Sequence, residues 1–149
     1  MATRGTIALF GKKAIKVYTH WDGYLDHNGL ILLTSFNRKR RLKYLLSFGE
    51  ISSLNTKVKV TKKVKDAFNS SSTTSFYHRD RNESLNVNYN GDEEYNYIFY
   101  KGNWYVYYND FKGKLDLLKV RRVNGKYKIS YRKVEIPDDL YKFILRVKR

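Results

Sequence analysis

The stretch that decides the fold is 95-YNYIFYKGNWYVYY-108, in which two aromatic runs flank a short polar turn. Aromatic residues favour strands, so the stretch predicts a β-hairpin with strands at 95–100 and 104–108. Alternation along the first strand separates Tyr95, Tyr97 and Phe99 from Asn96, Ile98 and Tyr100. One face of this hairpin must belong to the core, and the other is the only part of it left for recognition.

Similar patterns occur at both ends of the chain. Residues 6–10 and 14–19 predict a hairpin around Gly11, and residues 115–121 and 126–132 predict another, turned at Asn124-Gly125. A helix is expected over 38–48 with Asn37 as its N-cap, and a last helix begins at Pro137. The alternating segment 57–61 predicts a strand, and the Ser, Thr and Asn tract 69–75 predicts a mobile loop. The fold class is therefore α+β, a mainly antiparallel sheet built from hairpins with two or three helices.

The length of 149 residues suits one compact domain with an extension. We expect an α+β domain over residues 1–109 and a basic C-terminal extension over 110–149, a hairpin plus a helix packed on the same domain. The absence of cysteine excludes disulfides, thiolate metal sites and a cysteine nucleophile. No apolar run approaches the length of a membrane span, so a soluble intracellular protein without membrane contact is expected.

The formal net charge of +16 is unevenly distributed along the chain. Residues 37–65 and 110–149 are strongly basic, whereas residues 66–109 are mildly acidic. Such a field attracts polyanions, of which nucleic acid is the commonest. An alternative is that lysines fill solvated positions under weak selection.

The stretch 17-VYTHWDGYLDHNG-29 is rich in groups that bind metals or act as acids and bases. A metal-dependent nuclease or phosphodiesterase would use His20, Asp22, His78 and Asp80, although their spacing matches no helical pattern such as paired histidines one turn apart. We instead expect a structural loop, in which Trp21 and Tyr24 plug onto the core while His20 and Asp22 bond backbone groups.

Other catalytic signatures are missing from the sequence. No glycine-rich phosphate loop or serine-nucleophile motif is present, and no cofactor is expected. Asp92, Glu93 and Glu94 are consecutive, so we expect them to be solvated or paired with arginine rather than to form an acid–base pair.

Binding residues are predicted in the two basic blocks and on the aromatic hairpin. Long-range attraction is assigned to Arg38, Lys39, Arg40, Arg41, Lys43, Arg121, Arg122, Arg132 and Lys133. Tyr105 and Tyr107 are predicted to add stacking on bases.

A series of short motifs carries a resemblance. The series is Tyr18-x-His20-Trp21-Asp22-Gly23-Tyr24, then Gly29 and Leu32-Leu33, then Gly49-Glu-Ile-Ser-Ser-Leu54, His78-Arg-Asp-Arg-Asn-Glu83 and Glu93-Glu-Tyr-x-Tyr-x-Phe-x-x-Gly-x-Trp104. In this order they resemble a group of small accessory proteins encoded by bacteriophages and prophages, over about the first 108 residues. Leu25, Glu50 and Asn82 depart from that group's pattern.

The resemblance implies a phage setting but no reaction. By analogy with small phage proteins that lack catalytic signatures, it implies inhibition of a host defence system such as CRISPR, in the cytoplasm of the infected bacterium. The expected partner is anionic: nucleic acid, a nucleoprotein defence complex or a nucleotide signal. The hypothesis is therefore a non-enzymatic anti-defence protein, with the metal-dependent nuclease or phosphodiesterase as the alternative.

Overall fold

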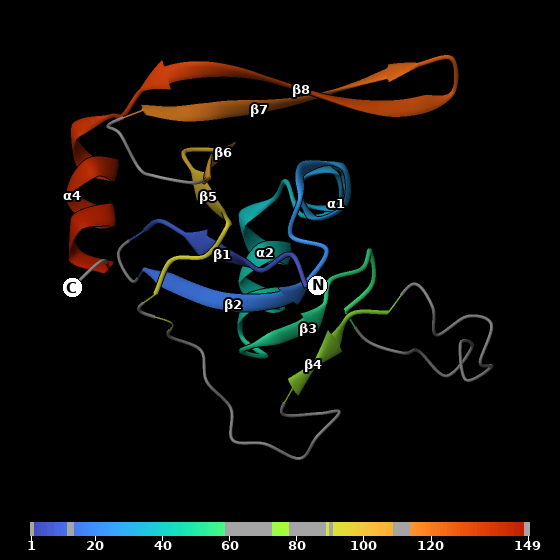
Figure 1. Cartoon of the computed structure of the whole chain (residues 1–149), viewed down its shortest axis with the longest axis horizontal. Coiled ribbons are helices and arrows are strands. Elements are labelled where there is room, and N and C mark those ends of the chain that lie inside the picture. Colours follow the sequence, from blue (N-terminus) through green and yellow to red (C-terminus); the bar gives the residue numbers. More distant parts are fainter. Residues whose placement is uncertain are drawn as a thin grey trace.

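The computed structural model describes residues 2–11, 14–58, 73–77, 89, 91–108 and 114–147. Eight strands form one sheet in the order β4-β3-β2-β1-β5-β6-β7-β8 (Figure 1). Three α-helices and one π-helical turn accompany the sheet in the described part of the chain. The α+β class predicted from the sequence is confirmed.

Three hairpins supply six of the eight strands. β1 (Gly5–Leu9) pairs with β2 (Ile15–Trp21), β5 (Tyr95–Tyr100) with β6 (Asn103–Tyr108), and β7 (Lys114–Val123) with β8 (Lys126–Glu135). Each pair is antiparallel, as the alternating patterns predict. β7 continues the sheet beyond β6 through the pairs Tyr105–Leu117 and Val106–Asp116.

The joins between distant segments are parallel, which the sequence analysis did not predict. β1 pairs with β5 in parallel, and β2 pairs in parallel with β3 (Ile51–Ser53). β4 (Ser75–Phe76) closes that edge antiparallel to β3. The sheet is therefore mixed, although antiparallel pairs predominate.

The polar tract before β4 is partly ordered rather than wholly a loop. Thr73 makes a parallel bridge with Lys57, and Thr74 is buried, with its hydroxyl bonded to the backbone N–H and carbonyl of Asn55. The prediction of a mobile loop over residues 69–75 is therefore wrong at its C-terminal end, where these bonds hold the chain in place. The rest of that loop, and residues 59–61 of the expected strand 57–61, lie outside the described residues.

One face of the sheet, here called the first face, carries the larger core. Its central residues are Ile7, Val17, Tyr97 and Trp104. They pack under α1 (Leu30–Ser35) and α2 (Lys39–Leu46), together with Phe36 between these helices. The Trp104 indole N–H donates to the Phe36 carbonyl at 3.2 Å, so the buried indole is satisfied.

The helices on this face begin differently from the prediction. The π-helical turn η1 (Leu25–Gly29) leads directly into α1, and neither of these helical segments is among the predicted elements. α2 has Arg38, not Asn37, at its N-cap, and no side chain caps it. The extended backbone of Arg38 delays the first helical residue to Lys39.

The second face carries a smaller core under α4 (Asp138–Val147). Ala8, Ile98 and Tyr107 of the central strands pack there with Leu115 of β7 and Leu140 of α4. Both faces of the β5–β6 hairpin are therefore covered, which overturns the expectation of one free aromatic face. In Figure 1, α4 stands at the base of the β7–β8 ribbon.

Candidate nucleic-acid interface

The β7–β8 hairpin is a long twisted ribbon whose turn lies away from the central strands (Figure 1). In the described part of the chain, the pairs between β6 and β7 involve Tyr105 and Val106 alone, so most of the ribbon extends past its neighbour strand. Its turn contains Asn124 and Gly125, both with positive φ, and nothing lies within 4 Å of a Cβ placed on Gly125. The distal ribbon is thus exposed to a partner.

The register of the ribbon gathers cations on one side. Directly opposite pairs point to the same side, so the second face of the sheet continues along Leu117–Arg132, Lys119–Ser130, Arg121–Lys128 and Val123–Lys126. We call the exposed cations there the cationic face: Lys119, Arg121, Lys126, Lys128 and Arg132. None of the ten residues that β7 and β8 place on this side is acidic. Like charges directly opposite one another do not stabilise a hairpin, whereas a cluster of this kind attracts anions.

The other side of the ribbon attaches it to the core and exposes two aromatic rings. Leu118 is buried, and Val120 and Ile129 pack against the same cluster. On the same side, Tyr127 toward the turn and Tyr131 opposite Leu118 are 53% and 54% exposed. The exposed rings and cations of this side are here called the aromatic face: Arg122, Tyr127, Tyr131 and Lys133. The Arg122 guanidinium carbon lies 5.9 Å from the centre of the Tyr127 ring.

The predicted tail cations are therefore split between two sides. Arg121 and Arg132 lie on the cationic face, whereas Arg122 and Lys133 lie on the aromatic face. Sequence reasoning missed Lys119, Lys126 and Lys128, and also the two exposed tyrosines. Counting in steps of two outward from the Asn124-Gly125 turn would have found them.

The basic residues of α2 are all exposed, as expected. They are Arg38, Lys39, Arg40, Arg41 and Lys43, and they surround a buried leucine stripe of Leu42, Leu45 and Leu46. Arg41 has a structural role: its Nε donates to the Ser35 carbonyl at 2.8 Å and its Nη2 to the Thr56 carbonyl at 2.7 Å. Its guanidinium also lies 5.0 Å from the centre of the Phe36 ring. Arg41 thus links α1 to the segment after β3, and its guanidinium is engaged in these contacts within the protein.

Tyr107 does not present a stacking surface. Its side chain is 6% exposed, and its hydroxyl donates to the Asp92 carboxylate at 2.8 Å. Burial, followed by the Asp92 charge, raises the pKa of Tyr107. A base cannot stack on a covered ring, so this part of the predicted binding set is corrected. Tyr105 is partly buried against the smaller core.

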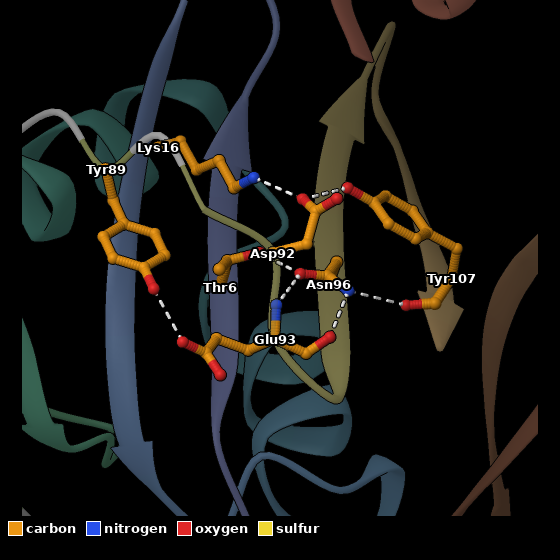
Figure 2. Close-up of polar contacts among 7 residues, drawn as sticks. All are labelled: Thr6, Lys16, Tyr89, Asp92, Glu93, Asn96 and Tyr107. Atoms are coloured by element: carbon orange, nitrogen blue, oxygen red, sulfur yellow. Dashed lines mark hydrogen bonds and ion pairs between the residues drawn. The ribbon is translucent and has the colours of Figure 1, made fainter. Parts of the chain in front are cut away.

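The acidic segment before β5 is tied into a polar network on the second face (Figure 2). Asp92 accepts a hydrogen bond from the ammonium group of Lys16 at 2.7 Å, and Glu93 accepts one from the Tyr89 hydroxyl at 2.6 Å. The Asn96 amide donates to the Glu93 carbonyl, and its oxygen accepts from Thr6 and from the Glu93 N–H (Figure 2). Asp92 and Glu93 therefore have lysine and tyrosine partners rather than arginine, whereas Asp92 and Glu94 are exposed to solvent as expected.

The residues that close the loop 17–29 are not those predicted. Trp21 and Tyr24 are 44% and 39% exposed, so neither plugs the core. Instead the buried Tyr97 hydroxyl donates to the Gly23 carbonyl at 2.6 Å, and the Gly29 N–H donates to the same hydroxyl. The loop is thus anchored by its backbone, through a tyrosine far away in sequence.

Gly23 permits this anchoring because of close backbone contacts. A Cβ at Gly23 would lie 2.9 Å from the Thr3 carbonyl oxygen and 3.0 Å from the backbone of Arg4. The Gly23 N–H also donates to the Thr3 carbonyl at 2.7 Å. No side chain fits there unless the N-terminal segment moves.

The candidate metal ligands are only partly placed. The His20 Nδ1 lies 2.6 Å from the Tyr18 hydroxyl, and Asp22 adopts a left-handed backbone with φ of 57°. His78 and Asp80 lie outside the described residues. Within the described ranges, no three His, Asp or Glu side chains gather as a metal site would require. The alternative enzymatic function stays a prediction.

Comparison with known proteins yields no match to a protein-family model, a curated protein or a solved structure. Among the helices of the described residues, none has the length and apolar character needed to cross a bilayer.

Proposed function

We propose that this protein binds nucleic acid through the cationic face of the β7–β8 ribbon, without cleaving the nucleic acid. The observation that carries the proposal is the gathering of Lys119, Arg121, Lys126, Lys128 and Arg132 on one exposed side of a projecting hairpin. Phosphate contacts from such cations release condensed counterions, which supplies most of the affinity of non-specific binding.

The geometry of the ribbon supports this interpretation. A two-stranded β-ribbon is narrow enough to enter the major groove of duplex DNA. The exposed rings of Tyr127 and Tyr131 on the other side offer stacking surfaces to unpaired bases. The exposed cations of α2 add to the long-range field that steers a polyanion toward the protein.

The biological role that we propose is inhibition of a host defence nucleoprotein, such as a CRISPR effector, in an infected bacterium. This role rests on the resemblance to phage accessory proteins and on the charge of +16. A ribbon that occupies a nucleic-acid channel or coats the target strand would block recognition by competition, and no reaction is needed.

The test is binding to labelled single-stranded and duplex DNA and RNA by the triple variant Lys119→Gln/Arg121→Gln/Lys128→Gln. The matched control is Lys39→Gln/Arg40→Gln/Lys43→Gln, which removes the same formal charge from α2. We expect the ribbon variant to bind at least about tenfold more weakly than the control. The ribbon variant loses direct contacts to phosphates, whereas the control loses only long-range electrostatic attraction.

Two results would overturn the proposal. Equal losses in the two triple variants would show that net charge, not the ribbon, binds the polyanion. Cleavage of the labelled strands in Mg²⁺ or Mn²⁺ that stops with chelator would favour the metal-dependent nuclease instead.

A further inference from the structure

A cavity of about 550 Å³ lies where the end of β1 and the β5–β6 turn meet the start of α2. Its size falls within the range of small-molecule sites, about 300–1,000 Å³. The lining residues come from three segments: 9–11, 37–39 and 99–102. The cavity is separate from the β7–β8 ribbon, none of whose residues line it.

The floor of the cavity is apolar and aromatic. Leu9, Phe99 and Tyr100 are buried there, and Phe10 packs edge-on against Tyr100 with ring centres 5.0 Å apart. Such a floor favours a flat apolar group over a bare inorganic ion.

The rim of the cavity is cationic. Arg38, Lys39 and Lys101 line it, and no lining residue in the described chain is acidic. The Lys101 ammonium lies 5.3 Å from the centre of the Tyr100 ring, and the Lys39 ammonium lies 4.0 Å from a Cβ placed on Gly11. Cations from the start of α2 and from the β5–β6 turn therefore both line the cavity, and charged groups of this kind bind anionic groups strongly.

The start of α2 adds to this field. Arg38 occupies the N-cap with extended backbone, and no side chain caps the helix. Backbone N–H groups of a first helical turn carry partial positive charge, and here they lie beside the cationic rim. The cations at this helix end oppose the macrodipole, a cost that a bound anion would offset.

We propose that this cavity binds a nucleoside phosphate, with its phosphates at the rim between Arg38, Lys39 and Lys101 and its base on the floor beside the partly exposed ring of Phe10. Apolar floor and cationic rim together match a ligand that is aromatic at one end and anionic at the other. The site goes beyond the proposed function, because it uses neither the cationic face nor the aromatic face of the ribbon.

Calorimetric titration of the full chain with the four ribonucleoside 5′-triphosphates tests the proposal. We expect saturable 1:1 binding of at least one of these triphosphates. Tripolyphosphate and free nucleosides should bind more weakly, because tripolyphosphate lacks the base and a nucleoside lacks the phosphates. The variant Arg38→Gln/Lys101→Gln should weaken the binding by about tenfold or more, whereas Arg121→Gln/Lys128→Gln should not.

A variant that leaves the charge of the protein unchanged separates this site from the nucleic-acid interface. Gly11→Leu fills open space, because only the Lys39 ammonium comes within 4.0 Å of the new Cβ. We expect Gly11→Leu to abolish nucleotide binding. The melting temperature of this variant and its binding of duplex DNA should be unchanged. The proposal is overturned if no triphosphate binds saturably, if tripolyphosphate binds equally well, or if a folded Gly11→Leu binds the nucleotide as wild type does.

Discussion

Replacing Tyr97 by phenylalanine removes one oxygen atom from the interior and should destabilise the protein more than replacing the exposed Tyr127 in the same way. The hydroxyl donates to the Gly23 carbonyl at 2.6 Å and accepts from the Gly29 N–H, and all three residues are buried. Phenylalanine keeps the ring packing but leaves a buried carbonyl and a buried N–H without this partner. Each such group costs about 1–3 kcal/mol, so we expect a loss of about 2–4 kcal/mol in the free energy of unfolding.

The assay is urea unfolding followed by far-UV circular dichroism, with Tyr127→Phe as the matched control. Tyr127 is 53% exposed, so its variant should stay within about 0.5 kcal/mol of wild type. For a chain of this size the loss in Tyr97→Phe corresponds to a fall in Tm of about 2–4 °C per kcal/mol. Faster hydrogen exchange at the Gly29 amide should accompany it. A Tyr97→Phe variant as stable as Tyr127→Phe would refute the claim that this hydroxyl anchors the loop.

Three further predictions concern the described core and loop. Burial, followed by the neighbouring Asp116 charge, raises the pKa of Tyr108 to about 12, so the stability that this group contributes is complete below its unfolded pKa near 10 and is lost as pH rises toward 12. The fall in the free energy of unfolding between pH 9 and pH 12 should therefore be smaller in Tyr108→Phe than in wild type, and equal falls would contradict the raised pKa of Tyr108. Asp22→Ala should lower the free energy of unfolding by about 1 kcal/mol and Asp22→Asn should leave it almost unchanged, because the φ of 57° suits asparagine far better than alanine. Thermal melts of the two variants test this, and an Asp22→Ala melt equal to wild type would argue against backbone strain at that site. Gly23→Ala should destabilise by about 3 kcal/mol or more, since its Cβ would meet backbone atoms 2.9–3.0 Å away, whereas Gly11→Ala should be neutral in the same urea assay.

Local patterns in the sequence predict much of this fold. The alternation in 95–108 and the Asn124-Gly125 turn identify two hairpins, and the leucine spacing in 38–48 identifies α2. These elements depend on neighbours within a few residues, which a sequence pattern records directly.

The errors fall where distant segments meet. The parallel pairing of β1 with β5 joins residues about ninety positions apart, and no local pattern encodes it. Tyr107 was predicted to be available for stacking because alternation separates two faces but does not say that a later helix, α4, covers one of them. Likewise Trp21 and Tyr24, predicted to plug the loop onto the core, are exposed, and the loop is anchored through the backbone of Gly23 by the distant Tyr97.

The most direct test of the central claim is the salt dependence of duplex DNA binding. Five phosphate contacts from the cationic face predict that log K falls with log salt at a slope of about −4.5, and neutralising Lys119, Arg121 and Lys128 should reduce its magnitude by about 2.7. The matched α2 variant should change the slope by less than about 1, because its cations steer rather than contact. An unchanged slope in the ribbon variant, or an equal change in both, would contradict the assignment of the β7–β8 ribbon as the nucleic-acid interface.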